Sequence, residues 1–129
     1  MLKMLVKYVM TLTTWFLLSN NAFATTYPFE SSVVLHGKIM MIKSLHPSAQ
    51  FSGGKQPAIV LNQRIIVEDS NGQIKTKLIQ LISSNHILYS KLFKNNGKNI
   101  TVTCNKLFRA ETAHHTTKVI CNVNRVQYQ

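Results

Sequence analysis

Acidic side chains are scarce in this sequence. Only four of its 129 residues are Asp or Glu, against 15 Lys and Arg; the four are Glu30, Glu68, Asp69 and Glu111. General acid–base catalysis needs a positioned acid and base, and no two of these carboxylates are spaced as a recognisable catalytic pair. A Gly-x-Ser-x-Gly nucleophile elbow is also missing, although a Ser–His–Asp triad assembles in space and stays open. We expect a protein that is not an enzyme.

Long hydrophobic runs are missing too. The longest apolar stretch, residues 8–18, is shorter than the ~20 residues that span a membrane, which argues against the alternative of an anchoring helix. Lys3 and Lys7 precede this stretch, and Ala22 and Ala24 form an A-x-A cleavage pattern after it. We interpret residues 1–24 as a secretory signal peptide and residues 25–129 as one domain. The predicted location is periplasmic or secreted.

Cysteine occurs only at Cys104 and Cys121, and neither Cys-x-x-Cys nor His-Glu-x-x-His is present. Two cysteines behind an export signal favour a single disulfide in an oxidising compartment. In the chain-entropy model a bridge between these positions contributes about 3 kcal/mol of stability. No cofactor is predicted.

The positive charge is the main clue to partners. Removal of residues 1–24 takes away only Lys3 and Lys7, so the mature chain stays strongly basic. Such a surplus favours polyanions. Export argues against nucleic acid, which leaves an anionic glycan, a lipid headgroup or an exported protein. The alternative is that the lysines only keep a small exported protein soluble.

The hydrophobic pattern predicts the elements. Residues 25–32 are expected to be a lead-in. Alternation predicts strands over Val33–Lys43, Ala58–Glu68 and Gln73–Ile82. Helical spacing with an Asn85 cap predicts a short helix over Asn85–Asn95. A hairpin then completes the order β-β-β-α-β-β, which is typical of a mainly β, five-stranded OB-like β-barrel with one short helix.

The last hairpin, residues 97–126, has a self-consistent apolar face. Side chains alternate faces in a strand, so both cysteines fall among inward-facing apolar residues, together with Ile100, Val102, Val119 and Val123. The register that we expect places Cys104 opposite Cys121 and Val102 opposite Val123.

Two polar connections carry the candidate site. In an OB barrel the loop after the first strand and the loop after the fourth flank the binding face; here they are residues 44–57 and 109–116. The candidate ligand-binding residues in these loops are His46, Arg109, Glu111, His114 and His115. Imidazole pairs can hold zinc or copper, so His114 and His115 are weak metal candidates. The alternative is that the loop histidines hydrogen-bond to backbone.

The hairpin also resembles a known family. The sequence contains Gly97-Lys-Asn-Ile-Thr-Val-Thr, followed by Leu107-Phe-Arg-Ala-Glu-Thr-Ala-His-His-Thr. These segments are similar to the signature of DUF4431, a bacterial family of uncharacterised exported domains. The chain departs from it by lacking a proline-rich run between the first two strands and by having Cys104 where glycine is common. The resemblance implies an exported β domain, singles out His114 and His115, and implies no activity.

These features together predict an exported binding module of unknown ligand, for an anionic glycan, lipid or polymer. One alternative is a protein-interaction role, as an inhibitor, an immunity-type protein or a subunit of a secreted assembly. A small metal-binding protein is the third reading.

Overall fold

The computed structural model describes residues 24–43, 54–111 and 115–129. Six strands and one helix follow in the order β1 (Thr25–Pro28), β2 (Val33–Lys43), β3 (Lys55–Asp69), β4 (Gly72–Ile82), α3 (His86–Lys94), β5 (Asn99–Arg109) and β6 (Val119–Tyr128). The predicted strands and helix are therefore present, with β3 starting three residues earlier than the alternation indicated.

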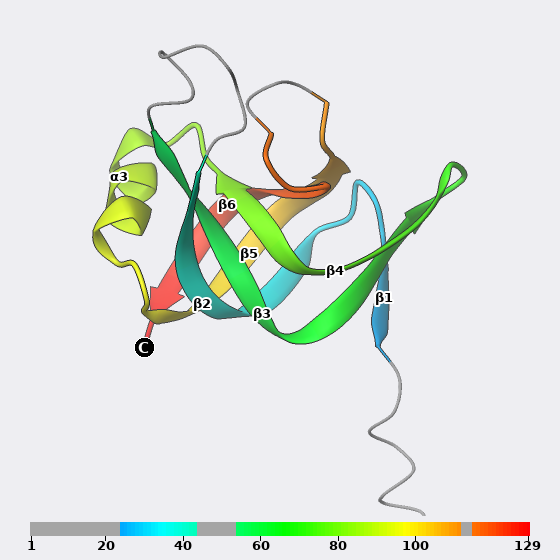
Figure 1. Cartoon of the computed structure of the whole chain (residues 1–129), viewed down its shortest axis with the longest axis horizontal. Helices are drawn as coiled ribbons and strands as arrows, with labels where there is room; N and C mark the ends of the chain where they lie inside the picture. The colour runs from blue at the N-terminus through cyan, green and yellow to red at the C-terminus, as the bar shows by residue number, and fades with distance from the viewer. Residues whose placement is uncertain (1–23, 44–53, 112–114) are drawn as a thin grey trace, which may run out of the picture.

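The strands close into a barrel (Figure 1). They lie in the order β1-β3-β2-β5-β6-β4, and an additional pairing of β3 with β4 closes the ring of five. The β4–β6 pair is parallel, as are β1 and β3, whereas the other neighbours are antiparallel. Because α3 also falls between β4 and β5, the predicted OB-like β-barrel is confirmed.

Apolar side chains on the inner faces of the strands fill the barrel. The alternating positions predicted to face inward in β2 and β3 are buried, apart from the partly buried Met41; they include Val33, Leu35, Ile39, Ile59, Leu61, Ile65 and Val67. Leu92 of α3 is also buried in this cluster. A two-residue alternation in the strands is therefore sufficient to define the core.

Gly37 lies where β2 bends across β3. A Cβ atom at this position would lie 2.1 Å from the carbonyl oxygen of Val60. Only a residue without a side chain permits this close approach of β2 to the backbone of β3.

The helix begins and ends at residues that satisfy its free backbone groups. The side chain of Asn85 accepts hydrogen bonds from the N–H groups of Ile87 and Leu88. At the other end, Asn95 is the C-cap, and Gly97 adopts a φ of +85° that suits glycine. The predicted helix is confirmed.

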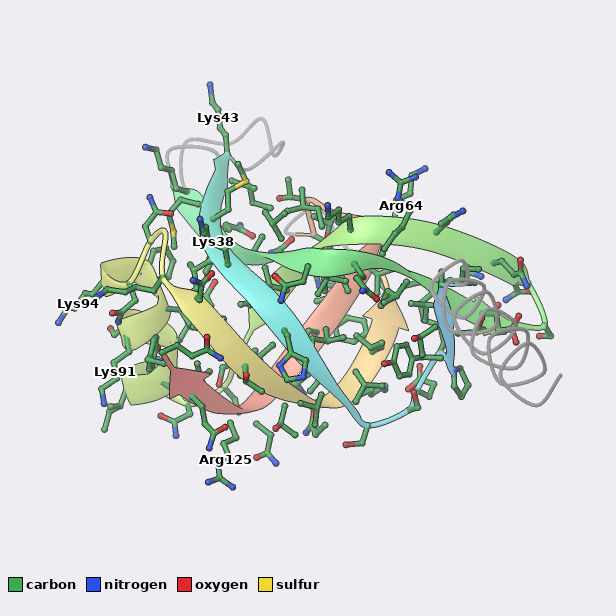
Figure 2. All side chains as sticks on the ribbon, turned by 90° about the horizontal axis from the view of Figure 1, so that it is seen from below. Lys38, Lys43, Arg64, Lys91, Lys94 and Arg125 are labelled. Carbon is green, nitrogen blue, oxygen red and sulfur yellow. A yellow bond between two sulfur atoms is a disulfide. The ribbon has the colours of Figure 1, made fainter. Side chains whose placement is uncertain are left out.

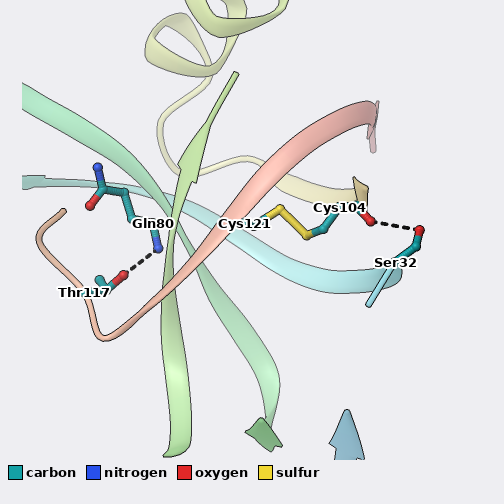
Figure 3. Close-up of a disulfide and its surroundings, with 5 residues drawn as sticks. All are labelled: Ser32, Gln80, Cys104, Thr117 and Cys121. Atoms are coloured by element: carbon teal, nitrogen blue, oxygen red, sulfur yellow. Dashed lines mark hydrogen bonds between the residues drawn. A yellow bond between two sulfur atoms is a disulfide. The ribbon is translucent and has the colours of Figure 1, made fainter. Parts of the chain in front are cut away.

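The predicted disulfide joins Cys104 to Cys121 (Figure 3), with the two Cα atoms 5.4 Å apart. The predicted register is wrong, however. Cys104 pairs with Val123, and Cys121 pairs with Leu107. The pairs on either side of Cys104, such as Thr103 with Arg125 and Leu107 with Cys121, share one register, and it is displaced by three residues from the predicted one. The two register shifts next to Cys104 offset each other, so they affect the pairing only locally. The bridge therefore runs diagonally between the strands.

The segment predicted as a lead-in also differs. Residues 25–28 form the strand β1, which pairs in parallel with residues 65–68 of β3. Phe29 then packs into the core, and its N–H donates to the carbonyl oxygen of Glu68 at 2.8 Å. The short strand adds a sixth member to the sheet outside the closed ring of five.

Candidate functional site

The predicted site residues fall in different settings. His46 and His114 lie outside the described residues, whereas Arg109, Glu111 and His115 lie within them. Arg109 is the last residue of β5, and the other two belong to the connection between β5 and β6.

The guanidinium of Arg109 joins the end of β5 to the turn between β3 and β4. It donates to both carboxylate oxygens of Asp69, at 3.0 and 2.8 Å, and to the carbonyl oxygen of Gly72 at 2.9 Å. Its other side lies over the Phe29 ring, 4.5 Å from the ring centroid. The hydrogen bond from Arg109 holds the pKa of Asp69 below its usual range. Arg109 therefore fastens three segments of the chain together.

His115 and Glu111 meet across the base of the same loop. The backbone N–H of Glu111 donates to Nδ1 of His115 at 2.8 Å. The imidazole ring also makes an edge contact with Phe108, with the centroids 5.5 Å apart. This geometry fits the alternative in which a loop histidine bonds to backbone.

Gln80 was not predicted as a site residue, yet it ties the loop to the barrel. It is 1% exposed, and its side-chain oxygen accepts the N–H of Thr116 at 2.6 Å while its amide donates to Gln56. Its own N–H donates to the hydroxyl of Thr117 at 2.9 Å (Figure 3). Its position between the apolar residues Ile79 and Leu81 is the signal that could have identified it as a buried polar residue.

An open groove crosses the outer face of the barrel. Its volume is about 600 Å³, and its lining comes from β2, β3, β4, the turn after α3 and the first residue of β5. Lys38 and Lys77 contribute ammonium groups to the lining, Met40 and Val60 contribute apolar surface, and amides come from Asn62, Asn96 and Asn99. The lining contains no carboxylate.

Two more lysines face each other at the open end of the β2–β3 pair. Lys43 of β2 is the direct register partner of Lys55 of β3. Like charges directly opposite in a sheet repel each other. This positive pair stands at the base of the connection that contains His46.

Negative charge is gathered at one end of the molecule. Glu68 and Asp69 end β3, Glu30 follows β1 and pairs with Lys106 at 2.6 Å, and Glu111 comes two residues after β5. These are all the acidic residues of the chain. In contrast, Figure 2 shows Lys38, Lys43, Lys91 and Lys94 toward the α3 end.

Two further findings concern the described residues alone. No group of three or more His, Cys, Asp or Glu side chains among them is placed to hold a metal ion. Within the same parts of the chain, no helix is long and apolar enough to cross a bilayer.

The strand order and the outer groove define the chain as a small OB-like barrel with a basic outer surface. Residues 78–127 match the family described as Domain of unknown function (DUF4431), so the predicted resemblance is confirmed for this part of the chain. No curated protein matches the chain.

Among solved structures, the chain is similar to the "small single-stranded DNA-binding protein from Streptomyces coelicolor". The identity is 10%, the TM-score is 0.41, and the alignment covers 78% of this chain and 94% of that chain. Because the TM-score is low, this likeness carries no functional information, and the barrel assignment depends on the strand order.

Proposed function

We propose that the protein is an exported binding module that holds an anionic glycan or similar anionic polymer in the groove across β2, β3 and β4. It binds this partner and does not convert it. Export is supported by Lys3 and Lys7 near the start of the chain and by the A-x-A pattern that precedes Thr25. The periplasm or the cell exterior is the location that follows from it.

The observation that carries the proposal is the separation of charge. All four carboxylates of the chain lie near the β3–β4 turn and the C-terminal end of β5. Two of them are paired with Lys106 and Arg109. The lysines of the groove are therefore left to a partner that brings its own negative charge.

The chemistry of the groove suits an acidic sugar chain. Ammonium groups of Lys38 and Lys77 can each meet a carboxylate or sulfate, and the neighbouring asparagine amides can both donate to and accept from hydroxyl groups. Met40 and Val60 offer apolar surface for the less polar face of a sugar ring. A carboxylate in the lining would repel the ligand, and none is present.

The strand composition argues against nucleic acid. Proteins that bind single strands stack bases on aromatic side chains of the sheet, at about 1–3 kcal/mol per base. β3 and β4, which form the binding face of an OB barrel, contain no Phe, Tyr or Trp. Basic side chains without a stacking surface favour a polyanion with no bases.

Binding to polygalacturonate tests the proposal, with uncharged dextran as the reference polymer. Replacing both Lys38 and Lys77 by Gln should weaken binding about tenfold, at roughly 0.5–1 kcal/mol for each exposed charge contact. The matched control replaces Lys75 and Lys118 by Gln, which are exposed outside the groove and change the net charge equally. Binding should also fall steeply as salt rises.

Three results would contradict the proposal. The first is an equal loss of polygalacturonate binding in both double variants, because net charge alone would then explain the binding. The second is failure of the wild-type protein to bind polygalacturonate and dextran sulfate alike. The third is capture of an exported protein at an affinity that salt leaves unchanged, which would favour the protein-interaction role through an apolar interface.

A further inference from the structure

The outward face of α3 combines exposed apolar surface with positive charge. Leu92 points into the core, and Leu88 packs partly against it. Ile87 is 76% exposed, and Lys91 and Lys94 follow at four and seven residues, which places the three side chains on one side of the helix. A helix that packs on a barrel normally presents polar side chains at such positions.

The neighbouring end of β6 extends this surface. A groove of about 390 Å³ lies between α3 and β6, and its lining includes Ile87, Leu88, Lys91, Arg125, Val126 and Tyr128. Tyr128 is 38% exposed. Ile87 and Tyr128 are two of the five large hydrophobic residues that are exposed within the described parts of the chain.

The charge of this surface is of one sign. Lys91, Lys94 and Arg125 lie around the apolar residues, and Figure 2 shows all three toward the same end of the molecule. The lining of the groove contains no Asp or Glu. The four carboxylates of the chain lie near the β3–β4 turn and the end of β5 instead.

We propose that α3 and the end of β6 form a docking surface for an anionic lipid membrane. Ile87 enters the apolar layer, Tyr128 lies at the level of the headgroups, and Lys91, Lys94 and Arg125 contact lipid phosphates. A bilayer is apolar immediately beneath an anionic layer, which matches an exposed isoleucine one turn from a lysine. A water-soluble polyanion offers no apolar layer for Ile87. The lining of this groove shares no residue with the groove proposed for the glycan.

A tryptophan reporter tests the docking directly. The only Trp of the chain is Trp15, within the predicted signal peptide. After cleavage the protein therefore has no tryptophan fluorescence of its own. Ile87→Trp should shift its emission to shorter wavelength on addition of phosphatidylglycerol–phosphatidylcholine vesicles, and should not do so with phosphatidylcholine alone. Lys75→Trp, on β4, is the matched reporter and should not shift with either.

Cosedimentation with the same vesicles then measures the binding. Ile87→Gln should weaken it severalfold, and Lys91→Gln should weaken it about fivefold, as expected for one basic residue near an anionic surface. Lys75→Gln should leave it unchanged. Met40→Gln, in the glycan groove, should also leave vesicle binding unchanged while it weakens polygalacturonate binding, which keeps the two sites distinguishable.

Several outcomes would overturn the inference. Wild-type protein that stays in solution with anionic vesicles would refute it. Vesicle binding by Ile87→Gln that equals wild-type binding would also refute it. So would an equal loss of vesicle affinity in Lys75→Gln and Lys91→Gln, because binding would then reflect net charge alone.

Discussion

Replacing Gln80 by Leu tests how the hairpin loop is held on the barrel. Leucine has a similar size but neither donates nor accepts, so the N–H of Thr116 loses the acceptor that lies 2.6 Å away. Gln56 loses its partner as well, but it is only partly buried and can turn to water. The bond from the Gln80 backbone to Thr117 uses no side-chain atom of Gln80 and should remain.

The expected cost follows from the Thr116 N–H, which loses its acceptor. A buried donor without an acceptor costs about 1–3 kcal/mol; because Thr116 is partly buried, we expect about 1–2 kcal/mol. For a domain of this size each kcal/mol lowers Tm by about 4–8 °C. Gln56→Leu is the matched control. It removes the acceptor of the buried Gln80 amide and leaves the acceptor of Thr116 in place, so its Tm should also fall while the Thr116 amide keeps its protection.

Two measurements check this prediction. Thermal unfolding followed by circular dichroism gives the stability of both variants, and hydrogen exchange gives the protection of the Thr116 amide. In Gln80→Leu that amide should exchange faster than it does in Gln56→Leu. An unchanged Tm together with unchanged protection of Thr116 would show that the loop is held by other contacts.

Four other predictions concern the bridge, acid stability, the loop histidine and processing. Exported protein should resist alkylation until reduced, because Cys104 and Cys121 are joined; intact mass measures this, and reduction should cost about 3 kcal/mol. The pKa of Asp69 is lower in the folded protein than its ordinary value of 3.8. The ion pair with Arg109 therefore contributes its full stability at pH values above 3.8, and this contribution is lost as the pH falls through the pKa of the folded state. Asp69→Asn should make Tm fall less between these two pH values than it does in the wild-type protein. His115→Ala should cost about 1 kcal/mol, since its Nδ1 accepts a backbone N–H; a variant that melts like wild type but no longer binds polygalacturonate would instead make it a ligand residue. N-terminal sequencing of exported protein should begin at Thr25, and a chain that retains residues 1–24 would contradict cleavage.

The elements of the barrel could be predicted because their signals are local. Alternation identified the inward residues of β2 and β3, and Asn85 and Gly97 marked the limits of the helix. The register of the last hairpin could not be predicted, because alternation assigns side chains to the two faces of a strand but does not fix which residues lie opposite each other. The observed register is displaced by three residues from the one that places Cys104 opposite Cys121.

The candidate site was predicted only in outline, because its contacts join distant parts of the chain. Arg109 was identified as a loop residue, but its partner Asp69 lies 40 residues earlier and no pattern connects them. Gln80 likewise bonds to Thr116, 36 residues away. The groove that contains Lys38 and Lys77 depends on barrel closure, which places three strands side by side.

The position of the disulfide links barrel closure to the redox state. The closed ring includes the parallel pair β4–β6, whose register consists of only three residue pairs, and Cys121 belongs to the central one. Its bond to Cys104 attaches this short junction to β5, which is joined to β2 by six pairs. In a reducing compartment the junction would depend on those three pairs and the packing around them. The oxidised bridge therefore stabilises the short junction that completes the barrel.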